Sequence, residues 1–367
     1  MLSVIKPNKR IRIKDIAEKA NVSIGTVDRV IHNRGEVNPD TRNKILKILE
    51  ELDYHPNILA STLASKKTYQ FAVLIPETPK TDVYWSQPLQ GIKRAANELL
   101  QYGVNINLYQ FSQSDPASFR SKANEILKNK PEGVVMAPFF SRESDEFIKK
   151  LGISCIPFVF IDSSITNSNQ LSFIGQNSFQ SGMLAAKLFD YSLPEQATIV
   201  IIHFGKELDN QNHPKQRERG FCNYFGTQPR NSAKSISTIE IDTLAVANLF
   251  EVLDSELAKI GPVNGIFVTN SQVYRIAEYL VSRNIQHIRL IGHDLIPQNA
   301  DFMRTGVVDF LICQRPEEQG YKAVQTLFEY VLLKKQVKTD NYTSIDIVTK
   351  ENLDYYKEFN QSNYGSN

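Results

Sequence analysis

The side chains that could carry out catalysis are not grouped in a known catalytic motif. The 6 histidines are scattered, and the sequence contains no HExxH zinc motif, G-x-S-x-G nucleophile elbow, G-x-x-x-x-G-K-[ST] phosphate loop or G-x-G-x-x-G dinucleotide fingerprint. The 3 cysteines, Cys155, Cys222 and Cys313, are widely separated without CxxC spacing, which indicates a reducing compartment. We therefore expect a protein that is not an enzyme and holds neither a cofactor nor a metal.

Chemistry suited to a polyanion is concentrated near the N-terminus. Residues 1–68 contain 13 Lys+Arg and 8 Asp+Glu, a balance of +5, whereas the remainder contains 29 against 32, a balance of −3. Such asymmetry favours a nucleic-acid partner, although a basic surface can also simply be solvated. Within this segment, Thr26 and Arg29 would offer a hydroxyl and a guanidinium on the exposed side of a short helix.

Three short helices are expected to position these groups. Apolar residues recur at helical spacing in residues 13–20, Ser23 is placed to cap a second helix, and Asn38 with Pro39 begins a third. The side chains expected to form their shared core are Ile13, Ile16, Ala17, Ala20, Val27, Val30, Ile31, Ile45, Ile48, Leu49 and Leu52. Two short helices a few residues apart are typical of a helix-turn-helix. A helical bundle that merely packs on the rest of the chain has the same pattern.

The amino-acid sequence of this segment distinguishes a helix-turn-helix from a helical bundle that only packs on the rest of the chain. Over about 55 positions without a gap, DIAEKANVS, TVDRVIHN, VNPDTRNKI and YHPNILASTLA resemble the DNA-binding headpiece of the lactose-repressor/galactose-repressor (LacI/GalR) family. The resemblance implies that the second helix enters the major groove, with Ser23, Thr26 and Arg29 at DNA-contacting positions and Arg29 facing guanine. It also places Leu63, in a hinge at residues 57–65, as a wedge in the minor groove. The cation of Arg12 could contact a phosphate, although Arg12 departs from the family pattern.

Four positions of this segment depart from the family pattern. The base-reading positions at the start of the second helix are Ile24 and Gly25, whose side chains have no hydrogen-bond donors. Asp28 stands where the family usually has Ser, and Arg12 stands where a Ser or Thr cap is usual. The operator sequence of the family therefore cannot be transferred to this chain.

From Tyr69 onward, short apolar runs alternate with amphipathic segments. The expected strands lie at residues 71–75, 104–111, 133–138, 157–162, 197–202, 265–268, 288–292 and 307–313. Between most of these strands lie amphipathic segments expected to be helices, such as residues 88–102, 117–129, 178–191, 243–260 and 317–333. This alternation predicts an α/β fold with a doubly wound parallel sheet, covered by helices on both faces and binding ligands at the carboxyl ends of its strands.

Residues 70–350 also resemble the effector domain of the same family, which is related to periplasmic sugar-binding proteins. The resemblance implies two α/β lobes joined by three crossovers, with residues 69–163 and 315–340 in the first lobe and 164–313 and 343–348 in the second. An effector between the lobes would change their angle and thereby the headpiece spacing. The domains expected are a headpiece (1–56), a hinge (57–68), an effector-binding and dimerisation domain (69–350) and a C-terminal tail (351–367).

Matching motifs to that resemblance assigns seven residues to the effector: Tyr84, Trp85, Asp162, Arg217, Asn270, Asp294 and Gln314. Carboxylates, amides and a guanidinium around an aromatic ring suit a polyhydroxylated ligand such as a sugar, and Trp85 is expected at the mouth of the site. Without the match, the aspartates could cap turns, the arginine could be a surface charge and the tryptophan could belong to the core. Ser271 and Gln176 replace aspartates that are frequent in the family.

The whole pattern predicts a homodimeric repressor that binds a palindromic operator in double-stranded DNA under the control of a carbohydrate effector. An enzyme on the same scaffold would require the catalytic motifs named above, and a transport-type sugar-binding protein would require a secretion signal. Neither a signal-peptide stretch nor a run of about 18 apolar residues is found, so we expect a soluble cytoplasmic protein without a membrane partner. The effector, the operator, the sign of control, and dimer against tetramer stay open.

Overall fold

The computed structural model describes residues 12–31, 34–52, 54, 67–78, 84–165, 167–205, 212–227, 234–242 and 248–356. The chain forms two compact units that divide between residues 65 and 66. Residues 57–66 of the predicted hinge, with Leu63, and the end of the predicted tail from residue 357 lie outside the described residues.

Three helices form the described part of the first unit: α1 (Ile13–Ala20), α2 (Ile24–Ile31) and α3 (Pro39–Glu51). They share one small core, whose buried members are Ile16, Ala17, Ala20, Val27, Val30, Ile45 and Ile48. Leu49, Leu52, Ile13 and Ile31 pack against this core while partly exposed. The predicted helix-turn-helix arrangement is confirmed.

Side-chain caps fix where two of these helices begin. The hydroxyl of Ser23 accepts a hydrogen bond from the backbone N–H of Thr26 at 3.1 Å, so α2 begins as predicted. Asn38 caps α3 by accepting from the N–H of Asp40 at 2.9 Å, and Pro39 occupies the first helical position. Local polar contacts thus set the boundaries of helices whose stability comes from the shared core.

The described part of the second unit consists of two lobes, each built on a six-stranded sheet. The first sheet has the order β11-β5-β4-β3-β1-β2, formed by β1 (Tyr69–Pro76), β2 (Val104–Phe111), β3 (Gly133–Met136), β4 (Phe158–Ile161), β5 (Ser172–Gly175) and β11 (Asp340–Tyr342). The second has the order β12-β10-β9-β8-β6-β7, formed by β6 (Thr198–Phe204), β7 (Ser235–Ile241), β8 (Gly265–Val268), β9 (Arg289–His293), β10 (Phe310–Cys313) and β12 (Asp346–Val348). Strands pair in parallel except β10 with β12. Both lobes therefore share one strand order and differ in the direction of the last strand, a repeat that was not evident in the sequence.

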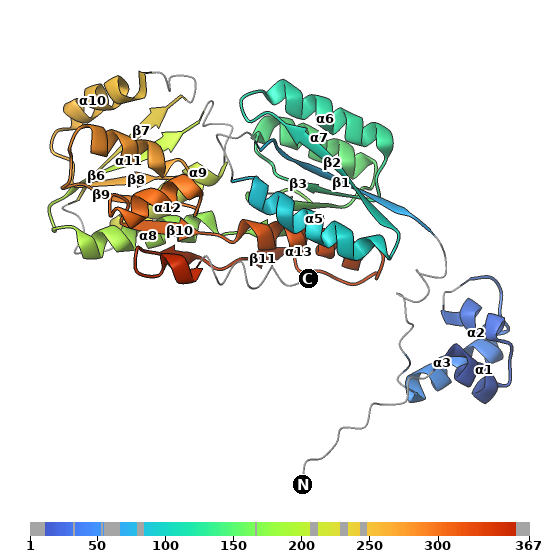
Figure 1. The fold of residues 1–367 in the computed structure, drawn as a ribbon. Coiled ribbons are helices and arrows are strands. Elements are labelled where there is room, and N and C mark those ends of the chain that lie inside the picture. The colour runs from blue at the N-terminus through green and yellow to red at the C-terminus, as the bar shows by residue number, and fades with distance from the viewer. Residues whose placement is uncertain are drawn as a thin grey trace, which may run out of the picture. The chain divides into compact units, whose positions relative to one another are not determined.

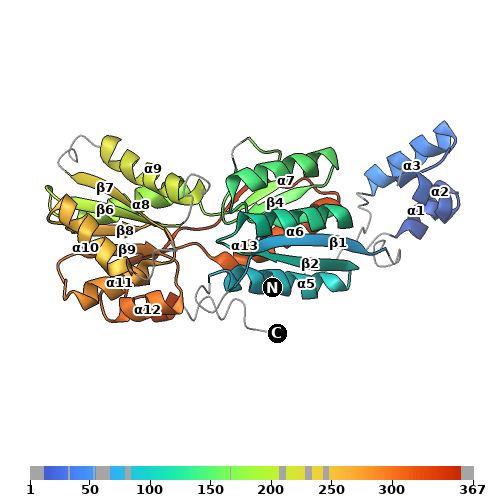
Figure 2. The same ribbon diagram turned by 90° about the horizontal axis from the view of Figure 1, so that it is seen from above.

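Helices cover both faces of each sheet, as the predicted fold class requires (Figures 1 and 2). The first lobe carries α5 (Ser86–Leu100), α6 (Pro116–Asn129), α7 (Ser141–Ile153) and α13 (Pro316–Val331). The second carries α8 (Ser178–Ser192), α9 (Asn212–Thr227), α10 (Leu249–Ile260), α11 (Val273–Ser282) and α12 (Pro297–Arg304). In the first lobe, α6 and α7 enclose an aromatic-rich core on one face of the sheet. In the second, α10, α11 and α12 cover one face, and α8 and α9 cover the other.

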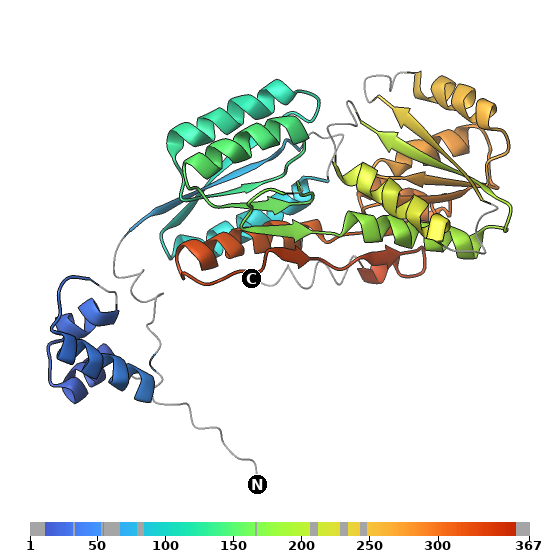
Figure 3. The same cartoon turned by 180° about the vertical axis from the view of Figure 1, so that it is seen from behind.

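The crossovers between the lobes correct one predicted boundary. We placed the first crossover at residue 163, but β5 pairs in parallel with β4, with Val159 opposite Ser172, so the first lobe continues to Gly175. The helix that follows β5, α8, then packs on the second lobe, and the helix that follows β10, α13, packs on the first (Figure 3). Each lobe is therefore covered by one helix that follows a strand of the other lobe. We call α8 and α13 the exchanged helices, and the chain that leads into each of them joins the lobes.

Short and edge elements account for the other differences from prediction. The strands β5, β7 and β11 were not predicted, because they are short or lie at sheet edges with an exposed face. The predicted tail is also wrong at its start, because Leu353 is 1% exposed in the core of the second lobe, which therefore reaches Tyr356. Along the described chain, no helix is both long and apolar enough to cross a membrane.

Candidate functional site

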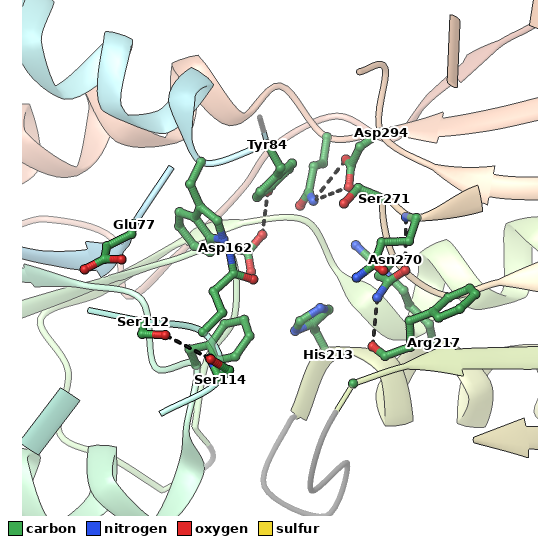
Figure 4. Close-up of a pocket in the computed structure, with 17 residues that line it drawn as sticks. Glu77, Tyr84, Ser112, Ser114, Asp162, His213, Arg217, Asn270, Ser271 and Asp294 are labelled. Atoms are coloured by element: carbon green, nitrogen blue, oxygen red, sulfur yellow. Dashed lines mark hydrogen bonds between the residues drawn. The ribbon is translucent and has the colours of Figure 1, made fainter. Parts of the chain in front are cut away.

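A cavity of about 330 Å³ lies between the two lobes, and all seven residues that the sequence assigned to an effector line it (Figure 4). The lining residues follow the ends of strands from both sheets, where doubly wound folds bind ligands. Residues that sequence reasoning missed also line it: Glu77, Ser112, Gln113, Ser114, Phe139, Phe204, Gly205, His213, Ser271 and Gln272. The fold thus gathers side chains from positions 77 to 314 around one space.

Two aspartates occupy equivalent positions in the two lobes. Asp162 directly follows β4 and Asp294 directly follows β9, the fourth strand of each lobe. Both have a positive φ, 68° and 65°, in a region where Asp and Asn are the commonest residues after Gly. Each wall of the cavity therefore carries one buried carboxylate at the turn that ends a strand.

The wall from the first lobe combines an aromatic pair with a carboxylate. The Tyr84 hydroxyl donates a hydrogen bond to Oδ1 of Asp162 at 2.6 Å, and the Tyr84 and Trp85 rings meet edge to face with centroids 5.3 Å apart. Burial raises the pKa of Asp162, while Tyr84 and Arg217 act in the opposite direction. Burial and the Asp162 carboxylate together raise the pKa of Tyr84 well above its usual value. Trp85 is 3% exposed, so it belongs to the wall and not, as predicted, to the mouth.

The wall from the second lobe is built on Arg217, which α9 presents to the cavity. Its Nη1 donates to the carbonyl of Thr269 at 2.6 Å, and its Nε has no partner among the described residues. The side chain is 2% exposed, which excludes the surface alternative. A Cβ built on Gly182 of α8 would overlap the carbonyl oxygen of Arg217. Close packing of α8 on α9 thus fixes the backbone from which this guanidinium extends.

Asn270 organises the loop after β8. Its Nδ2 donates to the carbonyl of Phe204 at 3.0 Å, and its Oδ1 accepts from the N–H of Gln272 at 3.1 Å. An amide nitrogen carries two hydrogens, so one N–H of Asn270 remains for a ligand. The side chain therefore joins the ends of β6 and β8 at the edge of the cavity.

A buried chain of hydrogen bonds connects the two walls through the crossovers. Nε2 of Gln314 donates to Oδ1 of Asp294 at 3.1 Å. Nε2 of Gln319 donates to the carbonyl and to Oε1 of Gln314, at 2.9 and 3.3 Å. Oε1 of Gln319 accepts from the N–H of Asp162 at 3.1 Å, and Asp162 accepts from Tyr84. Gln319 was not predicted, because a buried glutamine inside a helix belongs to no motif.

Histidines also surround this site, although their sequence positions suggested no cluster. Burial, assisted by the nearby charge of Arg217, lowers the pKa of His213 to about 3, so its ring is neutral near pH 7. The pKa of His293, at the end of β9, is lowered well below its usual value for the same reasons. Neither ring nitrogen of His293 has a hydrogen-bond partner among the described residues. His213 can therefore exchange hydrogen bonds with a neutral ligand without adding charge.

Among the described residues predicted to contact DNA, Arg12, Ser23 and Thr26 lie at the starts of helices, and Arg29 lies in the last turn of α2. Ser23 and Arg29 are exposed, and the half-buried Thr26 has its hydroxyl 2.9 Å from that of Ser23. Arg12 is exposed ahead of α1, and its backbone N–H donates to the carboxylate of Asp15 at 2.8 Å. Asp15 therefore supports the start of α1.

No cluster of three His, Cys, Asp or Glu side chains within the described ranges is placed to hold a metal ion. Cys155 and Cys222 are exposed, Cys313 is buried, and none of them forms a disulfide. The residues that line the cavity offer hydrogen bonding, charge and aromatic contact.

Comparison with known proteins identifies the family. Residues 12–57 match the profile of bacterial regulatory proteins of the lacI family, and residues 71–335 match that of a periplasmic binding protein domain. A protein from Bacteroides fragilis assigned as a LacI transcriptional regulator is 32% identical, covers 79% of this chain and 100% of its own, and superposes with a TM-score of 0.72. The chain belongs to the LacI family. The predicted family is thereby confirmed, and because it is a family of regulators, the enzyme alternative is not supported.

Two further proteins are similar to this LacI-family chain. Catabolite control protein A of Staphylococcus xylosus is 32% identical over 150 residues, which is 41% of this chain and 43% of that protein. The match thus spans less than half of that curated relative. A glucose-galactose binding protein from Geobacillus stearothermophilus is 25% identical, covers 78% of this chain and 99% of its own, and has a TM-score of 0.70.

Proposed function

We propose that this LacI-family chain regulates transcription by binding operator DNA through its headpiece, and that a sugar bound between its lobes controls that binding. The observation that carries the proposal is the convergence of all seven predicted effector residues on one cavity at the carboxyl ends of two parallel sheets. The headpiece and the cavity lie in separate units of one chain, which is the organisation of a regulator with a sensor.

The composition of the cavity favours a neutral polyol. Asp162 and Asp294 can accept hydrogen bonds from hydroxyls, whereas Arg217 and Asn270 can donate to them. Tyr84 and Trp85 supply an aromatic surface of the kind on which the CH face of a sugar packs. The similarity to a glucose-galactose binding protein supports the same class of ligand.

Coupling to DNA would follow from the crossovers. A ligand that contacts Asp162 in one lobe and Asp294 in the other favours a particular angle between the lobes, because the hydrogen-bond chain through Gln314 and Gln319 joins those walls. The LacI family resemblance supports a homodimer on a palindromic operator. In such a dimer, the lobe angle would set the separation of two headpieces.

The test uses the full chain and labelled duplexes selected by it from a randomised pool. Fluorescence anisotropy would follow operator binding while glucose, galactose and other monosaccharides are titrated, and the direction of the change gives the sign of control. Light scattering of the same sample should report a dimer. Failure to enrich any duplex would contradict the proposal.

Variants then locate the sugar site. Arg217→Ala and Asp294→Ala should still bind operator but require roughly 10- to 100-fold more sugar for the response, because each loses a charged hydrogen-bonding group. Arg219→Ala changes an exposed arginine on the same helix as Arg217 and serves as the matched control. A normal sugar response in both cavity variants would place the effector elsewhere.

A further inference from the structure

The exposed face of α2 begins with an apolar residue and a glycine. Ile24, the first residue of the helix, is 52% exposed, and Gly25 beside it is exposed as well. The later apolar residues Val27 and Val30 are buried in the headpiece core. Helical residues four apart share a face, so Gly25 lies on the same side as the exposed Arg29, and Ile24 is next to it at the start of the helix.

Packing within the headpiece does not account for the glycine. A Cβ built on Gly25 would meet only Oγ of Ser23, at 3.8 Å, which is ordinary contact. Its φ is not in the left-handed region, and glycine inside a helix is less stable than alanine. The position therefore keeps a destabilising residue on an open surface, where it lets another molecule approach the helix backbone closely.

The hydroxyls next to this pair are already engaged. Ser23 accepts from the N–H of Thr26 at 3.1 Å, and the two hydroxyl oxygens are 2.9 Å apart. They contribute mainly to capping α2. The side chain that projects at the start of the helix is thus an alkyl group, which can neither donate nor accept a hydrogen bond.

We propose that Ile24 reads operator sequence by contact with the methyl group of thymine, and that Gly25 allows the approach this contact needs. The inference rests on the proposed DNA binding. In helix-turn-helix proteins, the first residues of the second helix meet base edges in the major groove. Thymine presents a methyl group there, whereas the other bases present polar atoms that an isoleucine would desolvate without compensation.

The experiment isolates one methyl group at a time. The full chain selects duplexes from a randomised pool, and each thymidine of the enriched site is then replaced by deoxyuridine, which lacks only the methyl. At one thymine in each half-site, affinity should fall about fourfold, the value expected for losing one buried methyl. Ile24→Ala should bind thymine and uracil duplexes equally, and its circular dichroism should match that of the unmutated chain because the side chain is exposed.

A control and a second variant separate the alternatives. Leu46→Ala removes the other large exposed apolar side chain of the described headpiece, 46% exposed on α3, and should keep the preference for thymine. Gly25→Ala should raise the unfolding temperature of the headpiece yet lose operator affinity, a combination that a purely structural glycine would not give. Enriched duplexes without a methyl-dependent position, or a thymine preference that survives Ile24→Ala, would overturn this inference alone. Absence of any enriched duplex would overturn the proposed function with it.

Discussion

Replacing Gln319 with methionine breaks the hydrogen-bond chain between the lobes while preserving side-chain length. The change removes three hydrogen bonds, from the N–H of Asp162 and to the carbonyl and Oε1 of Gln314. Two of these groups keep another partner: Asp162 N–H also donates to the Ile174 carbonyl at 3.3 Å, and the Gln314 carbonyl also accepts from the Thr343 hydroxyl at 3.1 Å. Oε1 of Gln314 is the atom that loses its bond outright.

The expected loss of stability follows from that inventory. A buried acceptor left without a partner costs about 1–3 kcal/mol, and the two weakened groups add less, so Gln319→Met should lower the free energy of unfolding by about 2 kcal/mol. With a urea slope of about 3 kcal/mol per M for a unit of this size, the midpoint should fall by about 0.7 M. The freed Gln314 amide can also turn away from Asp294, so sugar affinity should fall as well.

Urea titration of the full chain, followed by emission of the single tryptophan, measures the first effect because Trp85 is buried in the first lobe. Gln325→Met is the matched control, since Gln325 is a half-buried glutamine on the same helix that bonds Tyr321 and Glu98 near the surface. Equal urea midpoints for the two variants would show that the hydrogen bonds of Gln319 do not stabilise the fold as calculated. A lower midpoint with unchanged sugar affinity would show that Gln319 stabilises the fold without positioning Gln314.

Three further outcomes test the cavity and its support. Sugar binding should change the fluorescence emission of Trp85. Trp85→Phe should abolish this signal but weaken sugar binding only modestly, because an aromatic face remains. A sugar that binds tightly without changing the emission would show that Trp85 is not part of the site. Gly182→Ala should lower both the urea midpoint and the sugar affinity, because the added Cβ displaces Arg217. Gly226→Ala places its Cβ in open space and should be neutral or stabilising. Equal effects of the two variants would contradict the close packing of α8 on α9. The hydrogen bond from His203 lowers the pKa of Glu218, so the ionised Glu218 stabilises the fold at neutral pH, and this stabilisation is lost as pH falls through the lowered pKa. Glu218→Gln should therefore make the urea midpoint less dependent on acid pH. The same acid dependence in the variant and the unmutated chain would show that this pair does not contribute to stability.

The headpiece was predictable from sequence because its determinants are local. Ser23 and Asn38 cap helices within three residues of themselves, and the apolar spacing of each helix is visible in a window of about ten residues. The strands buried in the middle of each sheet were predictable for the same reason, because they read as continuous apolar runs. Edge strands such as β7 expose one face and lack this signal.

The lobe boundaries were harder to predict because they depend on which strands pair. The residues of β5, Ser172–Gly175, do not indicate that this strand pairs with β4. The position of the crossover that follows β5 is defined only by that pairing. The exchanged helices raise the same difficulty. Contacts of α8 and α13 are made with segments distant in sequence, which composition and periodicity do not record.

The residues of the candidate site also differ in whether they could be predicted from local sequence. Its seven predicted residues come from motifs at the ends of strands, where a short stretch of sequence fixes both the element and the side chain that follows it. Gln319 and Gly182 act on those residues through backbone atoms of other elements: Gln319 bonds the N–H of Asp162, and Gly182 contacts the carbonyl of Arg217. Such support has no preferred spacing, because it is set by how helices cross and not by the chain between them. Changes in effector specificity could therefore arise at these supporting positions while every residue that contacts the ligand stays the same.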